Sequence, residues 1–205
     1  MGFLSAGASF SRYRLVEPAP DDTIRELHDR LRRHSFRDID DTVEERSWGW
    51  VSFEDMLDHR FHTAPPEKGE FAAFSLRLDT RRIPPAVMKK HFTIALNQEL
   101  AKAKEEGRKF VSKERKRELK ENVQLQLMGR TLPIPAVFDV VWNIPNGTIL
   151  FGSVRPKVQD LFTSHFTETF DLHLELLTPA ALAGSLLGSE AEPRLAGLTP
   201  AIFAA

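Results

Sequence analysis

Four side chains between residues 55 and 62 form the densest group of potential metal ligands in the sequence. They are Asp55, Asp58, His59 and His62, and the two histidines have the spacing His-x-x-His. A zinc site needs a fixed geometry and a fuller set of ligands, whereas this stretch is typical of a polar loop or a short helix. We therefore predict no metal site here and no cofactor for the chain. The other histidines are scattered and are assigned no role: His28, His34, His91, His165 and His173.

Sequence motifs for enzymatic chemistry are also absent. The chain contains no Walker-type glycine-rich loop, no dinucleotide-binding fingerprint and no nucleophile elbow. It has no cysteine, which excludes disulfides, thiolate zinc sites and cysteine nucleophiles. A nuclease would need clustered carboxylates to hold magnesium, and the nearest acids, Asp139 and Asp160, lack a suitable lysine companion. The sequence therefore predicts a protein that is not an enzyme.

Basic side chains gather between Leu100 and Lys120. This segment carries about +5, although the formal net charge of the whole chain is -1. At helical pitch its charges separate into a basic face and an acidic face. The basic face consists of Lys113, Lys116, Arg117 and Lys120, and the acidic face of Glu114, Glu118 and Glu121. Basic runs on exposed helices commonly serve only solubility, but on a projecting arm they can also neutralise nucleic-acid phosphates and release counterions.

The residues around this segment predict a helical hairpin. Pro84-Pro85 can open a helix that continues from Val87 to Arg108, with Gly107 as its C-terminal cap. Ser112 can cap a second helix that ends near Met128. The first helix has one apolar stripe, which consists of Met88, Phe92, Ala95, Leu96 and Ala103.

Residue patterns outside the hairpin predict strands and further helices. Strands are expected at Ser11–Val16, Ser47–Ser52, Glu70–Asp79, Ala136–Ile144, Thr148–Ser153 and Leu172–Leu177, with Asn146-Gly147 as a hairpin turn. Helices are expected at Asp22–His34, Arg155–Phe166 and Pro179–Leu187, before a loose tail from Gly188. Ser75, Arg77 and Asp79 alternate with apolar residues, which predicts one strand face in water. Trp48 and Trp50 share strand parity and would suit a base-stacking platform or, as we expect, the core.

Together these elements predict an α+β protein, with an antiparallel sheet body, packed helices and a projecting helical hairpin. Four parts are expected: the N-terminal α+β part of the body (1-83), the basic hairpin (84-132), a strand hairpin, helix and strand that complete the body (133-177), and an Ala/Leu/Gly-rich tail (178-205). No run approaches the roughly 18 apolar residues of a membrane span, and the first ten residues lack a signal-peptide pattern. We therefore expect a cytoplasmic protein that has no membrane partner.

The order of these elements resembles the N-terminal part of the RdgC family, bacterial recombination-associated DNA-binding proteins, with a shortened C-terminus. The likeness spans roughly residues 10 to 175. It is carried by Tyr13-Arg14-Leu15, Gly49-Trp50, Ile83-Pro84, Val87, Lys89, Arg108-Lys109, Lys113-Glu114, Leu119-Lys120, Val123, Arg130 and Asn146-Gly147. After Arg130 the chain has Thr131-Leu132, where family members often have an aromatic residue.

The resemblance implies nonspecific binding of double-stranded DNA by a homodimeric ring with a positive inner surface. Family members are associated with restraining recombinase action, so recombinase-coated DNA is a further implied partner and the nucleoid an implied location. With the charge pattern, this indicates the following DNA-binding residues: Lys89, Lys90, Arg108, Lys109, Lys113, Lys116, Arg117, Lys120 and Arg130. The alternative function is a protein-protein interaction module that docks a partner through the apolar stripe of the hairpin.

Overall fold

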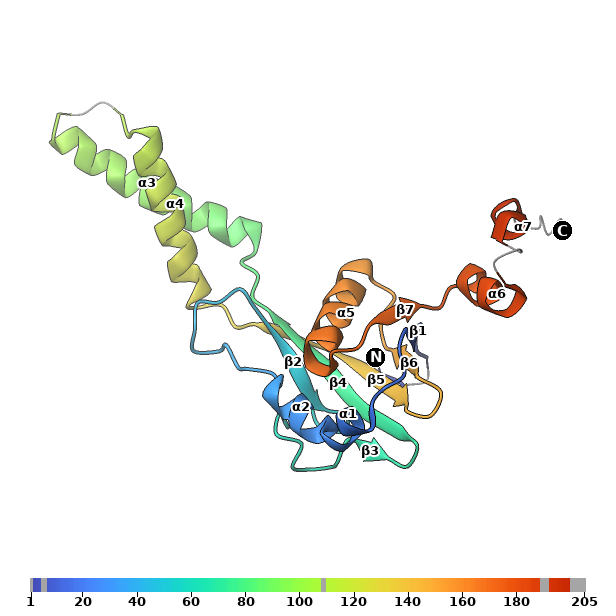
Figure 1. The fold of residues 1–205 in the computed structure, drawn as a ribbon. Coiled ribbons are helices and arrows are strands. Elements are labelled where there is room, and N and C mark those ends of the chain that lie inside the picture. The colour runs from blue at the N-terminus through green and yellow to red at the C-terminus, as the bar shows by residue number, and fades with distance from the viewer. Residues whose placement is uncertain (1, 5–6, 108–109, 189–191, 200–205) are drawn as a thin grey trace. The chain divides into compact units, whose positions relative to one another are not determined.

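The computed structural model describes residues 2–4, 7–107, 110–188 and 192–199 (Figure 1). The chain divides into two compact units. Unit 1 comprises Met1–Ser35, Trp50–Leu76 and Val137–Ala205, and unit 2 comprises Phe36–Gly49 and Arg77–Ala136. The four-part division expected from the sequence stays a prediction.

Seven strands of the described chain form one sheet, in the order β2-β4-β5-β6-β1-β7 with β3 paired to β4. The strands are β1 (Ser11–Leu15), β2 (Arg46–Ser52), β3 (Glu67–Lys68), β4 (Phe71–Thr80), β5 (Ile134–Asn143), β6 (Thr148–Phe151) and β7 (Leu174–Leu176). β1 pairs antiparallel with β6 and with β7, and β5 pairs antiparallel with β6. The predicted α+β class with an antiparallel sheet is confirmed.

Seven helices accompany the sheet in the described parts of the chain. They are α1 (Asp21–Arg25), α2 (Leu27–Arg33), α3 (Pro85–Glu105), α4 (Lys113–Met128), α5 (Pro156–Phe170), α6 (Pro179–Leu187) and α7 (Glu192–Ala196). α3, α5 and α6 each begin with a proline, whose fixed φ suits the first helical turn and whose missing N–H has no partner to lose there. Among the helices described, none combines the length and the hydropathy needed to cross a bilayer.

The core of unit 1 lies between α5 and the sheet. α5 presents Phe162, Phe166 and Phe170 on one face because residues four apart share a side of a helix. The ring of Phe162 stacks on Phe151 of β6 with centroids 4.1 Å apart, and Trp142 of β5 meets Phe166 and Phe170 edge-on. Each of these side chains is at most 1% exposed. Burial of each stabilises the fold by about 1.5–3 kcal/mol.

The β5–β6 hairpin forms at the predicted turn. Asn143 pairs with Thr148, and Gly147 has φ +66°, a left-handed conformation that costs glycine little. The Asn146 side chain accepts a hydrogen bond from the Thr148 N–H at 2.9 Å, which closes the turn. Both residues of the Asn-Gly signal therefore have a defined role.

The polar face of β4 differs from its prediction. Alternation predicts that Ser75, Arg77 and Asp79 lie in water, but these residues are only 0%, 8% and 1% exposed. In unit 1 the Ser75 hydroxyl donates to the Asp139 carboxylate at 3.1 Å, and in unit 2 Arg77 forms an ion pair with Asp79 at 2.7 Å. Polar side chains can be buried where each has a partner, so alternation alone misidentifies this face as solvated.

Three smaller expectations are also corrected. Trp50 is buried as predicted, but Trp48 is 42% exposed, because burial along β2 begins only at Gly49. The single helix expected at Asp22–His34 is broken at Glu26 into α1 and α2. The short helix α7 lies within the segment that was expected to be a loose tail.

Candidate nucleic-acid interface

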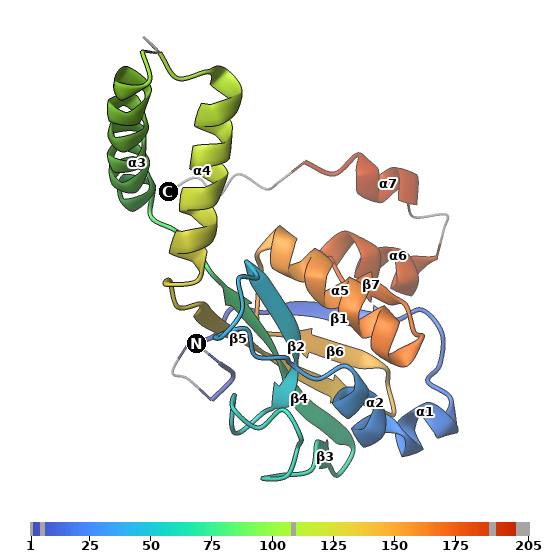
Figure 2. The ribbon, with the colours of Figure 1, turned by 90° about the vertical axis from the view of Figure 1, so that its left-hand side faces the viewer.

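Helices α3 and α4 of unit 2 form the predicted hairpin and lie side by side (Figure 2). The Ser112 side chain caps α4 by accepting a hydrogen bond from the Arg115 N–H at 3.2 Å. Ala103 of α3 and Val123 and Leu127 of α4 are buried. The rest of the apolar stripe is half-buried, at Met88, Phe92, Ala95 and Leu96. The Ser112 cap and the end of the second helix at Met128 are therefore confirmed, whereas the first helix ends at Glu105, before the predicted Arg108.

Arg115 fastens the two helices to each other. Its guanidinium binds Glu99 of α3 at 2.8 Å and Glu118 of α4 at 3.0 Å. The hydrogen bonds from Glu99 and then Glu118 raise the pKa of Arg115 further above its ordinary value. Arg115 thus serves the hairpin itself, although its residue type is the same as that of its basic neighbours.

The predicted basic face of α4 is exposed along its whole length. Lys113, Lys116, Arg117 and Lys120 are all exposed. Arg117 lies 3.7 Å from Glu121, a long and solvent-exposed ion pair. No carboxylate in the described part of the chain lies within ion-pair distance of Lys113, Lys116 or Lys120. These three ammonium groups are therefore free to bind an anion.

The remaining predicted DNA-binding residues have different placements. Lys89 and Lys90 are exposed in the first turns of α3, and Arg130 is exposed just beyond the end of α4. Arg108 and Lys109 lie outside the described residues. Because Lys89, Lys90 and Arg130 are exposed, their charged groups are accessible to a phosphate.

A hollow of about 330 Å³ lies in unit 2 beside the basic face. Lys120 and Gln124 of α4 line it together with Met88 of α3 and with Arg81 and Arg82, which follow β4. Sequence analysis did not identify Arg82, which is exposed and would add a positive charge next to Lys120. Its position just before the two prolines that open α3 is the only signal that could have placed it at the base of the hairpin.

Arg77 and Arg81 are basic residues with another kind of environment. The Arg77 guanidinium binds both carboxylate oxygens of Asp79 and lies 4.1 Å from the centroid of the Phe36 ring. Arg81 donates hydrogen bonds to backbone carbonyls of the loop that precedes β2: those of Ile39, Asp40, Thr42 and Glu44. Because their donors are either used or buried inside unit 2, neither arginine is a candidate to bind DNA.

The acids considered for a nuclease site do not form one in the described structure. The Asp139 carboxylate is buried in unit 1 and accepts hydrogen bonds from Ser75 and from the Phe3 N–H at 2.7 Å. Asp160 is exposed on α5. Within the described ranges, the one group of three potential ligands within 4.8 Å of one another is His34, His165 and Glu168. Its two histidines were expected to be scattered, and Glu168 was not identified from the sequence.

The predicted cluster near residue 58 is part of a loop. Asp58 is 9% exposed, and its carboxylate accepts hydrogen bonds from the Arg60 N–H at 3.1 Å and the Thr63 N–H at 2.7 Å. Burial alone would raise the pKa of Asp58, but backbone donors from Thr63, His62 and Arg60 lower it to about 2. The side chain therefore fixes the loop conformation.

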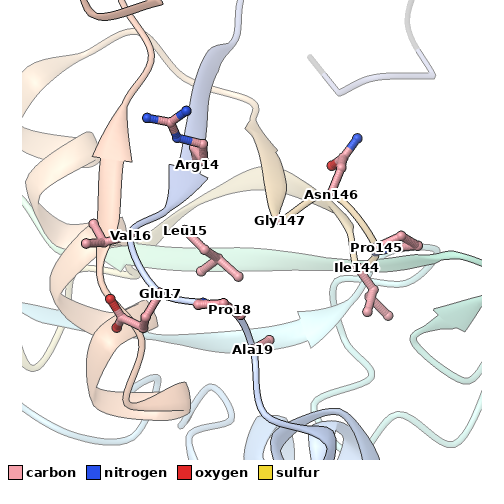
Figure 3. Close-up of a pocket in the computed structure, with 10 residues that line it drawn as sticks. All are labelled: Arg14, Leu15, Val16, Glu17, Pro18, Ala19, Ile144, Pro145, Asn146 and Gly147. Carbon is pink, nitrogen blue, oxygen red and sulfur yellow. The ribbon is translucent and has the colours of Figure 1, made fainter. Parts of the chain in front are cut away.

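A second hollow, of about 320 Å³, lies in unit 1 between the end of β1 and the β5–β6 turn (Figure 3). Its two charged lining residues, Arg14 and Glu17, each have a partner that does not line the hollow. Arg14 binds Glu175 at 2.8 Å, and Glu17 binds the His173 ring at 3.0 Å. Hydrogen bonds from the His173 backbone and then its ring lower the pKa of Glu17. This pairing leaves Arg14 and Glu17 poorly suited to act as an acid and a base in the hollow.

The sequence matches one known protein family over most of its length. The family is described as "Putative exonuclease, RdgC", and the match covers residues 9–187 of 205. It includes every strand, the α3–α4 hairpin and α6. No curated protein matches the chain.

Proposed function

The chain belongs to the RdgC family, and from this membership we propose that it binds double-stranded DNA without sequence preference and modulates DNA recombination. The observation that carries the proposal is the basic face of α4. Lys113, Lys116 and Lys120 have exposed ammonium groups without a carboxylate partner in the described chain, and Arg117 has only a long one. Such groups suit the phosphates of a nucleic acid.

The spacing of these charges fits a duplex. Positions 113 to 120 extend over about 10 Å of helix axis at 1.5 Å per residue. Double-stranded DNA presents about six phosphates in that length, since it carries one negative charge per roughly 1.7 Å. Lysine acts as a flexible point charge and reads no base pattern, so this face favours affinity without sequence selection.

We further propose that the protein works as a homodimer on DNA in the nucleoid, where recombinase-coated DNA is a candidate substrate. Self-association is supported by large apolar side chains that unit 2 exposes. Phe110 is 76%, Leu132 74% and Ile134 67% exposed. A second copy of the chain would remove such surface from water.

Binding, rather than cleavage, is the activity that the described residues support. Metal-dependent nucleases hold magnesium with clustered carboxylates, and the Asp139 carboxylate is committed to hydrogen bonds inside unit 1. We therefore expect a linear duplex incubated with the protein and Mg²⁺ to stay intact on a denaturing gel. Shortened strands that appear in proportion to the protein would overturn this part of the proposal.

Docking of a protein partner through the hairpin is the alternative. The apolar stripe that would serve it is half-buried, and Ala103 within it is 2% exposed. Salt separates the two functions, because phosphate contacts weaken steeply as salt rises and apolar contacts do not.

The test is a fluorescence anisotropy titration of a random-sequence duplex at several salt concentrations. One variant replaces Lys113, Lys116, Arg117 and Lys120 with alanine. A matched control replaces four exposed basic residues of unit 1 with alanine: Arg32, Arg33, Lys68 and Lys157. The two variants lose the same formal charge from different positions, and in the control Lys68 and Arg33 are also paired with Glu54 and Glu26.

We expect the α4 variant to stay folded by circular dichroism and to lose most of its affinity. Each lost phosphate contact lowers the magnitude of the salt slope by about 0.9, so four lost contacts lower it by about 3.6. The control should keep a slope close to that of the parent. Equal slopes for the parent and the α4 variant would contradict DNA binding through this face.

A further inference from the structure

Two histidines and a glutamate of unit 1 lie together. His34 follows the last residue of α2, and His165 and Glu168 lie one turn apart on α5. One ligand atom from each residue lies within 4.8 Å of the other two. His165 is 7% exposed, whereas Glu168 has a side-chain exposure of 68%. The group thus reaches from the interior of unit 1 to solvent.

The hydrogen bonds of His165 fix which ring nitrogen has a free lone pair. Its Nε2 lies 3.2 Å from the backbone carbonyl oxygen of His34. A carbonyl only accepts, so Nε2 must carry the hydrogen and, in the neutral ring, Nδ1 must carry the lone pair. Nδ1 is buried and has no hydrogen-bond partner in the described structure. It lies 3.7 Å from a carboxylate oxygen of Glu168.

A lone pair and a carboxylate oxygen that face each other at 3.7 Å can share a cation. A proton on Nδ1 is one solution. A metal ion is the other solution, since neutral imidazole is a common metal ligand. A buried polar atom without a partner is costly, which makes an unoccupied Nδ1 unfavourable.

The ring of His165 is held in place before any ion binds. The Trp50 ring lies against it with centroids 4.7 Å apart. The Trp50 indole N–H donates to the Thr169 hydroxyl at 2.7 Å, and that hydroxyl donates to the His165 carbonyl at 2.7 Å. Metal-binding histidines typically donate their second N–H to a carbonyl or a carboxylate, as Nε2 of His165 donates to His34.

We propose that His34, His165 and Glu168 bind one divalent transition-metal ion of the Zn²⁺ class. Two imidazoles and one carboxylate are a ligand set that zinc accepts, with water in the fourth position. Tetrahedral zinc with ligands at 2.0–2.1 Å places them about 3.3 Å apart, and the distance from Nδ1 to the Glu168 oxygen is 3.7 Å. The ligand atom of His34 lies within 4.8 Å of the other two, so rotations of the His34 and Glu168 side chains would have to bring the three ligands together. The bound ion would join the end of α2 to α5.

The test is calorimetric titration of the full chain, free of any histidine tag, with Zn²⁺ and separately with Mg²⁺. We expect one Zn²⁺ per chain and no binding of Mg²⁺ at this site, because Mg²⁺ prefers oxygen ligands. Zn²⁺ should also raise the melting temperature, since it binds the folded state. Co²⁺ should quench part of the tryptophan fluorescence, because Trp50 lies against the His165 ring.

Glu168→Gln and His34→Gln test the ligands without disturbing the buried ring of His165. Each should lower the Zn²⁺ affinity by about tenfold or more and abolish the Co²⁺ quenching, while circular dichroism stays unchanged. The matched control is His173→Gln, which breaks an exposed histidine–carboxylate contact at 3.0 Å, with Glu17. It should bind Zn²⁺ like the parent.

The proposal is overturned if the parent shows no saturable binding of Zn²⁺. It is also overturned if Glu168→Gln and His34→Gln both bind Zn²⁺ as tightly as the parent, or if His173→Gln alone removes binding. None of these outcomes depends on DNA. The metal site can therefore be disproved without affecting the proposed DNA binding, and DNA binding can be disproved without affecting the metal site.

Discussion

Two sets of basic residues in unit 2 have opposite environments. At the end of β4 and just beyond it, Arg77 and Arg81 are 8% and 4% exposed, and their guanidinium groups bind a carboxylate and several backbone carbonyls. On α4, the ammonium groups of Lys113, Lys116 and Lys120 are exposed and have no carboxylate partner in the described chain. The buried set consists of arginines and the exposed set of lysines.

The difference lies in where the donors of each side chain are used. Arginine has five N–H donors in a fixed plane, which suits several internal acceptors at once. Lysine is a compact, strongly hydrated charge that gains little from burial. We therefore expect substitution at the end of β4 to change stability and substitution on α4 to change binding.

The largest expected effect follows from removing the partner of a buried arginine. Asp79→Ala leaves the Arg77 guanidinium buried without its carboxylate, which should lower the free energy of unfolding by about 3–5 kcal/mol. Urea denaturation measures this change. The double variant Arg77→Met with Asp79→Ala should be less destabilised than the single variant, since no charge is left unpaired. A double variant that is worse than the single one would contradict this account.

Arg81→Ala should have the next largest effect. The loop carbonyls of Ile39, Asp40 and Glu44 would lose charged donors, at a cost of about 2–4 kcal/mol in the free energy of unfolding. Arg81→Lys should recover only part of the loss, because one ammonium cannot reach the same set of carbonyls. The adjacent exposed Arg82 is the control, and Arg82→Ala should change stability by less than about 0.5 kcal/mol. Equal losses of stability in Arg81→Ala and Arg82→Ala would contradict the contrast between buried and exposed basic residues.

Two arginines of α4 sharpen the comparison within one helix. Arg115 is bound to Glu99 and Glu118, whereas Arg117 has only a long contact with Glu121. Arg117→Ala should therefore lower the magnitude of the salt slope of DNA binding by about 0.9, and Arg115→Ala by less. Arg115→Ala should instead lower the melting temperature slightly, because it loosens α3 from α4. If both variants lower the salt slope equally, an ion pair within the hairpin does not prevent an arginine from binding DNA.

The smallest expected effect concerns the Asp58 carboxylate of unit 1, which, like the two buried arginines, has its partners inside the protein. Donors from the loop lower the pKa of Asp58 from 3.8 to about 2, so the folded state favours the ionised form. This contribution is fully present above about pH 4 and is lost as the pH falls toward 2. Asp58→Asn should be less stable than the parent at pH 7, and the difference should shrink across that window. Denaturation at several pH values measures it, and a constant difference would contradict the assignment.

Local signals in the sequence were enough to predict most elements of this fold. Ser112, Gly147 and the prolines that begin α3, α5 and α6 act within a few residues of their own position, so they can be interpreted without the tertiary structure. The hairpin and the exposure of its basic face were predicted for the same reason. DNA binding by that face stays a prediction.

Long-range partners could not be predicted in this way. Ser75 is buried because Asp139 accepts its hydroxyl, 64 positions along the chain, and alternation within β4 contains no sign of that contact. His34 and His165 meet although they are 131 positions apart, and neither has a neighbour in sequence that indicates the other. Sequence periodicity reports which residues share a face, and it does not report what covers that face.

The position of β1 in the sheet has a consequence for how the protein is made. β1 lies between β6 and β7, and its partners Leu150, Ile149 and Leu176 belong to the far end of the chain. At ordinary rates of synthesis, β1 leaves the ribosome roughly ten seconds before the first of them. During that interval its backbone donors and acceptors have no sheet partner from β6 or β7, so a holding chaperone that covers this strand would protect it from pairing with other chains.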